Sequence, residues 1–169
     1  MKKSGITAMV CLAIITLISC GNNNQAKNST METTEDRNEN IFPKGEKASN
    51  DYFTGTVFVE PLLNSEDMEG LYTVGQVTFE PGARTNWHTH PIGQVLLVLD
   101  GNGFYQERGK SARKLTKGSV VAIPKDVEHW HGATADSRFA HIAISNMADG
   151  NNVTWMTPVN NEEYSQVNP

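Results

Sequence analysis

All five histidines of this chain fall between residues 88 and 141, and four of them form two pairs with one residue in between. The pairs are His88/His90, in the run NWHTHP, and His129/His131, in the run EHWHGA. Side chains two residues apart on a β-strand point to the same face, roughly 6.6 Å apart along the strand. Each pair can therefore aim two imidazoles at one point, an arrangement that predicts a metal site. Imidazole binds Zn, Mn, Fe, Ni and Cu alike.

The segments around these histidines are typical of antiparallel β-structure. Short runs of β-branched and aromatic residues alternate with turn residues at near-regular spacing, which predicts a sandwich or a small barrel. The predicted strands are Tyr52–Val59, Tyr72–Phe79, Asn86–His90, Val95–Leu99, Gly103–Gln106, Ser119–Ile123, Phe139–Ile144 and Val153–Thr157. One helix is predicted at the C-terminus, over residues 162–166, with Asn160 or Asn161 as its N-cap.

The fifth histidine, His141, lies in the run FAHIAIS. On a strand it shares a face with Ala143 and Ser145, whereas Ile142 and Ile144 take the opposite face. Small neighbours of this kind predict the wall of a cavity. Small residues packed against a second sheet would give the same pattern, so the residues alone leave both interpretations open.

The histidine pairs also belong to two blocks of defined spacing. The first is Gly82, five residues, His88-Thr89-His90, three residues, Gln94, six residues and Gly101; the second is Gly118, five residues, Pro124-Lys125-Asp126, two residues and His129. These blocks resemble the two signature motifs of the cupin superfamily. The resemblance implies an all-β double-stranded β-helix, a jelly-roll barrel, with one divalent metal per chain held by His88, His90, Gln94 and His129. Gln94 stands where most cupins have glutamate.

A narrower resemblance extends over nearly the whole domain, through DYFTGTVFVEPLL, VTFEPGARTNWHTHPIGQ, HWHGA, FAHIAIS and VTWM. These runs are similar to small bacterial cupins that include manganese-dependent hydroxynitrile lyases of the (R)-mandelonitrile type and carboxymuconolactone-decarboxylase-associated cupins. The resemblance implies a lyase acting on a small hydroxylated or carbonyl compound, with Mn as the metal and Fe, Zn or Ni as alternatives. It also implies that His141 accepts a proton from the substrate. His131 shares its strand face with His129 and could orient the substrate or act as a second base.

Other functions stay open at this point. Either His131 or His141 could be a supporting or core histidine. The same ligands could hold Fe for a dioxygenase, or the domain could bind a small molecule without catalysis, because fold and ligands are shared by proteins of unrelated chemistry.

The N-terminus predicts export. Residues 1–19 have the charges and apolar run of a secretory signal, and they end in a lipobox-like sequence before Cys20. Residues 20–50 are polar and predict a flexible tether, and residues 51–165 form the predicted cupin domain. We therefore expect a lipoprotein of the cell envelope that is anchored to a membrane through lipid on Cys20. An ordinary signal followed by a chance cysteine is the alternative.

The charge balance argues against nucleic acid as a partner. The chain has 14 Lys+Arg against 19 Asp+Glu, a net charge of −5, and no basic stripe. The remaining cysteine, Cys11, would leave with the signal, so the domain must hold together without disulfides. The expected partners are a small-molecule substrate and, from the resemblance to small cupins, a second copy of the chain in a homodimer.

Overall fold

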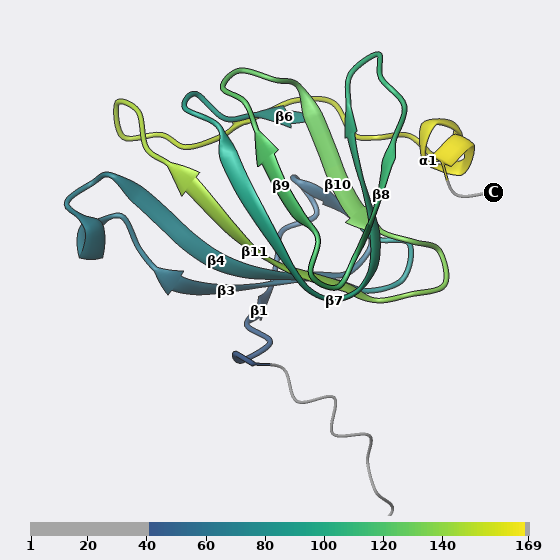
Figure 1. Cartoon of the computed structure of the whole chain (residues 1–169), viewed down its shortest axis with the longest axis horizontal. Coiled ribbons are helices and arrows are strands. Elements are labelled where there is room, and N and C mark those ends of the chain that lie inside the picture. The colour runs from purple at the N-terminus through teal and green to yellow at the C-terminus, as the bar shows by residue number, and fades with distance from the viewer. Residues whose placement is uncertain (1–40, 168–169) are drawn as a thin grey trace, which may run out of the picture. The chain divides into compact units, whose positions relative to one another are not determined.

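The computed structural model describes residues 41–167, which form two antiparallel sheets that curve toward each other, with one short helix at the C-terminus (Figure 1). The predicted all-β barrel with a C-terminal helix is confirmed. The predicted signal peptide, Cys20 and most of the predicted tether lie outside the described residues. No helix among the described residues is long and apolar enough to cross a membrane.

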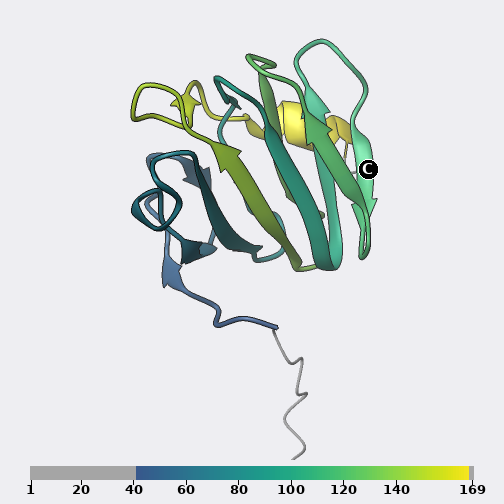
Figure 2. The same ribbon diagram turned by 60° about the vertical axis from the view of Figure 1, so that its left-hand side comes forward.

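The first sheet runs in the order β1-β3-β4-β11-β7-β9. Its strands are β1 (Glu46–Lys47), β3 (Val57–Leu63), β4 (Tyr72–Phe79), β11 (Phe139–Asn146), the first half of β7 (Gln94–Glu107) and β9 (Val120–Ile123). A short 3-10 helix, Glu66–Met68, connects β3 to β4. Figure 2 shows this sheet facing the second one. Buried side chains from both sheets form the core.

The second sheet is centred on β10 (His129–Ala133), which pairs with the second half of β7, with β5 and with β6. The other strands are β2 (Phe53–Thr54), β5 (Arg84–Thr85), β6 (His88–Thr89), β8 (Arg113–Thr116) and β12 (Thr154–Trp155). Both histidine pairs therefore belong to this sheet or to its border. His88 and His129 are direct register partners across β6 and β10.

Strand β7 is longer than the sequence predicts. We expected a turn at residues 100–103 between two strands, but one strand continues from Gln94 to Glu107 and passes from the first sheet into the second. Gly101 allows this bend because it has a φ of +73°, and a Cβ there would lie 1.7 Å from the carbonyl oxygen of Arg138. The residues expected to form a turn thus continue the strand, and the register shift beside them leaves Leu99 without a partner on β11, which is a bulge.

The contacts of the domain begin before the predicted boundary at residue 51. β1 pairs with β3, although its residues were assigned to the tether. Lys44 forms an ion pair with Glu80 at 2.7 Å, and the Gln76 side chain donates a hydrogen bond to the Pro43 carbonyl at 2.9 Å. Backbone pairing and these two contacts attach a segment that is too polar to form a core of its own.

The C-terminal helix α1 (Asn161–Val167) is the predicted one, with Asn160 as its N-cap. The Asn160 side chain accepts the backbone N–H of Glu163, and the Glu163 carboxylate accepts the N–H of Asn160, which makes a capping box. Tyr164 anchors the helix on the second sheet by donating its hydroxyl to the Ala133 carbonyl at 2.9 Å.

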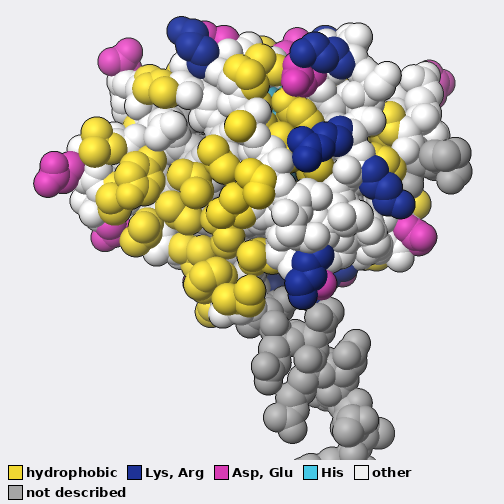
Figure 3. All heavy atoms as spheres, viewed as in Figure 1, with side chains coloured by type: hydrophobic (Ala, Val, Ile, Leu, Met, Phe, Trp, Pro, Cys, Tyr) yellow, Lys and Arg dark blue, Asp and Glu magenta, His cyan; other side chains and the backbone are white. Residues whose placement is uncertain are grey.

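The interior holds one main apolar cluster, contributed by both sheets. Its fully buried members include Phe79, Leu96, Leu115 and Phe139. The outer face of the first sheet carries an apolar patch as well. Val74, Ile144 and Val95 lie side by side on β4, β11 and β7, and Figure 3 shows hydrophobic side chains gathered over this part of the surface.

Candidate functional site

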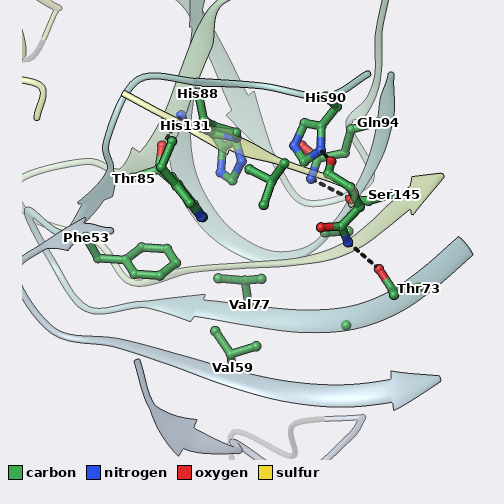
Figure 4. Close-up of a pocket in the computed structure, with 15 residues that line it drawn as sticks. Phe53, Val59, Thr73, Val77, Thr85, His88, His90, Gln94, His131 and Ser145 are labelled. Atoms are coloured by element: carbon green, nitrogen blue, oxygen red, sulfur yellow. Dashed lines mark hydrogen bonds between the residues drawn. The ribbon is translucent and has the colours of Figure 1, made fainter. Parts of the chain in front are cut away.

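The five histidines converge in the space between the two sheets, and all of them are buried. His88 comes from β6, His90 from the turn after it, His129 and His131 from β10 and His141 from β11. Figure 4 shows His88, His90 and His131 on one side of a cavity, with Gln94 and Ser145 beside them. The pairing of these strands therefore brings all six predicted site residues into one region.

Three of these imidazoles are oriented by backbone carbonyls. The Nδ1 atoms lie against carbonyl oxygens: His88 against Asn86 at 2.9 Å, His129 against Val127 at 2.8 Å, and His90 against Asn152. A carbonyl oxygen can only accept a hydrogen bond, so each Nδ1 carries the proton and each Nε2 presents a lone pair. This is the tautomer in which an imidazole binds a metal through Nε2.

Gln94, the fourth predicted ligand, lies beside these rings. Its side-chain nitrogen donates to the Ser145 hydroxyl at 3.0 Å, while its oxygen is buried and accepts no hydrogen bond from the described residues. The Nε2 atoms of His90 and His129 are also buried and unpartnered within the described chain. Buried polar atoms without partners are rare in folded proteins. Here the three atoms are lone-pair donors, which fits a cation.

The tightest group of ring nitrogens is a different one. His88, His129 and His131 offer nitrogens that all lie within 4.8 Å of one another. The ring centroid of His90 lies 5.1 Å from that of His88 and 5.6 Å from that of His129. The predicted ligand set and this group share His88 and His129. His90 and Gln94 complete the predicted set, whereas His131 completes the group of close nitrogens.

His131 differs from the other three in what its Nδ1 contacts. Nε2 of His141 lies 3.2 Å from Nδ1 of His131, so the two imidazoles share one proton across a hydrogen bond. His131 lines the cavity, whereas His141 is fully buried and is not among the lining residues. Ala143 and Ser145 do line it, so the predicted cavity wall on β11 is present. His141 lies on that face of β11 and reaches the cavity through His131.

Burial lowers the pKa of all five histidines. The pKa falls to about 4 for His129 and His141, mainly because the charged imidazolium would lose its hydration. It lies well below 6.5 for His88 and His131, where neighbouring imidazoles add to the effect of burial, and below 6.5 for His90. Each ring is therefore neutral near pH 7, the state that a metal ligand or a proton acceptor needs.

The cavity beside the histidines has a volume of about 230 Å³. One side carries the polar groups of His88, His90, Gln94, His131 and Ser145, and the other side is apolar, with Phe53, Val59 and Val77 (Figure 4). Val153 and Trp155 also line the cavity. No lysine, arginine, aspartate or glutamate lines it within residues 41–167. Such a cavity suits a small uncharged molecule with one polar end.

Comparison with known proteins identifies the family. Residues 75–145, which contain all six predicted site residues, match the family model described as a cupin domain. The chain is 44% identical over 118 residues to (R)-mandelonitrile lyase from Granulicella tundricola, an alignment that covers 70% of this chain and 89% of that enzyme. The chain belongs to the cupin family. The predicted fold and the predicted resemblance to mandelonitrile lyases are both confirmed.

Solved cupin structures agree with this assignment. The fold matches the crystal structure of a cupin-like protein from Thermotoga maritima with a TM-score of 0.73 and 50% identity, covering 76% of this chain and 97% of that one. A predicted oxalate decarboxylase from the same organism matches with a TM-score of 0.56 and 22% identity, over 61% of this cupin and 91% of that chain. The second likeness shows the shared fold alone.

The sequence did not reveal several residues of the site. Asn152, whose carbonyl orients His90, lies in the loop before β12 and is held by a hydrogen bond from its side chain to Thr73 at 2.9 Å. Trp155 on β12 packs with its ring centroid 4.8 Å from that of His88. Both come from a segment about 65 residues after His88, and only the pairing of β12 with β6 brings them to the site.

Proposed function

We propose that this cupin is a metal-dependent lyase that cleaves a small uncharged cyanohydrin into an aldehyde and cyanide. The observation that carries the proposal is the neutral His131, which faces an apolar cavity next to a cluster of buried, unpartnered lone pairs. The 44% identity to (R)-mandelonitrile lyase supports the reaction class.

The residues that would hold the metal are His88, His90, Gln94 and His129. Their fit rests on the backbone carbonyls that leave each Nε2 free, and on the unpartnered oxygen of Gln94. We place His131 outside the set because its Nδ1 is engaged by another histidine instead of a carbonyl, which leaves its proton free to move. A divalent ion at this site, with Mn first and Fe, Zn or Ni as alternatives, would bind the substrate hydroxyl and lower its pKa.

His131, hydrogen-bonded to His141, accepts the hydroxyl proton of the substrate and later releases it. When Nδ1–H of His131 donates to Nε2 of His141, Nε2 of His131 presents a lone pair. That atom accepts the hydroxyl proton of the substrate. The electron pair of the O–H bond forms the carbonyl, the carbon–carbon bond breaks, and its electrons leave with cyanide. Transfer of the proton from His131 to cyanide restores the neutral ring, and the lowered pKa of His131 favours this release.

His141 then has a different role from the one we predicted for it. We expected His141 to take the proton directly, but His131 is the histidine that lines the cavity. In our proposal His141 is a positioning residue: it sets the tautomer of His131 and stabilises the positive charge that forms there. This is the relation between a general base and the group that orients it.

Anaerobic turnover tests the proposal. Protein loaded with Mn(II), Fe(II) or Zn(II) should convert racemic mandelonitrile to benzaldehyde without oxygen. His131→Ala should lose on the order of 10²-fold or more in kcat while it retains its metal, the size expected for a general base. Turnover that requires oxygen would instead identify a dioxygenase, and binding without turnover would identify a non-catalytic cupin. Either result would refute the lyase.

Membrane attachment and assembly stay predictions. We expect the protein to partition with membranes through lipid on Cys20, and Cys20→Ala to release it. We also expect a homodimer, which the molar mass of the purified protein in solution would reveal. Recovery of the wild type in the soluble fraction with an unmodified N-terminus would contradict the anchor.

A further inference from the structure

We propose that Ser145 is a positioning residue that turns the amide of Gln94 so that its oxygen, and not its nitrogen, faces the histidines. The proposal rests on the metal site described above and deepens it. An amide has two ends of similar shape and opposite hydrogen-bonding character. A glutamine can therefore serve as a ligand only if the surrounding protein distinguishes its two ends.

The strand register places Ser145 where it can do this. Ser145 on β11 is the direct cross-strand partner of Gln94 on β7 and of Thr73 on β4, so the three side chains form one row on the inner face of the first sheet. Directly opposed residues have their Cβ atoms about 5 Å apart. Ser145 and Gln94 are 5% and 7% exposed, which leaves little water to take the place of the serine.

The hydrogen bond between them determines which end points inward. The Gln94 nitrogen donates to the Ser145 hydroxyl at 3.0 Å, and the Gln94 oxygen is left buried and unpartnered within residues 41–167. Without the hydroxyl, this orientation would leave the N–H₂ group buried without an acceptor, which is unfavourable. The amide could then rotate and donate to the Nε2 lone pairs of His90 or His129. Metal binding would have to reverse that rotation, so affinity would fall.

A carboxylate has no such alternative. In a Gln94→Glu variant the two side-chain atoms are equivalent oxygens, and neither can donate to an imidazole when ionised. Removal of Ser145 should therefore weaken metal binding in the chain with glutamine and have little effect in the chain with glutamate. A structural role of Ser145 in packing would weaken both chains equally.

The experiment is a double-mutant cycle on the affinity for Mn(II), measured by calorimetry and by the electron paramagnetic resonance signal of the free ion. Ser145→Ala should raise the Kd about tenfold or more, within the range seen when a group that supports a ligand is removed. In the Gln94→Glu background the same substitution should change the Kd less than about threefold. Ser145→Thr keeps the hydroxyl and should restore affinity close to that of the wild type.

Thr78→Val is the matched control. It also removes one buried hydroxyl from the first sheet, but that hydroxyl has no hydrogen-bond partner among the described residues. Its Kd should equal that of the wild type. An unchanged Kd in Ser145→Ala, an equal loss in both backgrounds, or a wild type that binds no divalent ion would each overturn the proposal. Because the readout is affinity, a protein that binds metal in this pattern without lyase turnover would support the role of Ser145 and refute only the proposed reaction.

Discussion

Lowering the pH should destabilise the metal-free protein, and the loss of stability should begin at a pH well above that at which its carboxylates titrate. His129 and His141 have pKa values of about 4 in the folded state because burial disfavours their charge, whereas an exposed imidazole titrates near 6.5. Between these values the unfolded chain binds protons that the folded chain does not. The free energy of unfolding is therefore highest above pH 6.5 and falls as the pH decreases toward 4.

The size of the loss follows from the two pKa values. For a group that titrates at 6.5 unfolded and at about 4 folded, lowering the pH from 7 to 5 removes about 2 kcal/mol of stability. Two such groups remove about 4 kcal/mol, which is a large part of the roughly 5–15 kcal/mol that stabilises a typical domain. The lowered pKa values of His88 and His131 add to the loss in the same direction.

Urea unfolding of chelator-treated protein at pH 7, 6 and 5, followed by circular dichroism, measures this loss. A His141→Gln variant has one titrating group fewer, so its stability should fall by about 2 kcal/mol less over the same range, whatever its stability at pH 7. Saturating Mn(II) should reduce the loss, because a ligand that binds the neutral histidines opposes their protonation. Equal stability of the metal-free wild type at pH 7 and pH 5 would refute the argument that these histidines are buried in the neutral form.

Three further predictions concern single sites. His129→Ala should remove most of the bound metal, which elemental analysis of protein purified without chelator will show; stoichiometric metal in this variant would mean that the site is misplaced. Asn160→Ala should lower the free energy of unfolding by about 1 kcal/mol, measured by urea denaturation, because the backbone N–H of Glu163 loses its acceptor. Gly101→Ala should unfold the domain or lower its melting temperature by more than any other change named here, as seen by calorimetry, since its Cβ would collide with the Arg138 carbonyl.

Local patterns predicted most of the strands and the group of candidate residues. They missed β8 and β10, and they gave Tyr52–Val59 as one strand where β2 and β3 belong to different sheets. Alternation of side chains along β10 and β11 depends only on the period of a strand, so it correctly placed His129 with His131, and His141 with Ala143 and Ser145. The C-terminal helix was predicted equally well, because its N-cap signal is local.

These local patterns could not predict which strands pair with one another. The turn residues around Gly101 continue β7 from one sheet into the other, next to a bulge at Leu99, and nothing within the run itself distinguishes this bend from a hairpin turn. The carbonyl of Asn152 reaches His90 only because β12 returns to pair with β6. The relation of His131 to His141 also depends on the depth of each ring between the sheets, which strand periodicity does not give.

In the proposed mechanism, His129 and His131 supply two kinds of chemistry from one strand. They are two residues apart on the same face of β10, and burial keeps both of them neutral. They differ in the partner of Nδ1. In His129 the partner is a backbone carbonyl, which can only accept a hydrogen bond and so holds the ring in one tautomer. In His131 the partner is the imidazole of His141, which can donate or accept and so permits either tautomer. A metal ligand needs the first condition, because its lone pair must stay available. A group that takes a proton and returns it needs the second. The same His-x-His spacing therefore predicts where both rings lie, and the atom opposite Nδ1 determines what each of them can do.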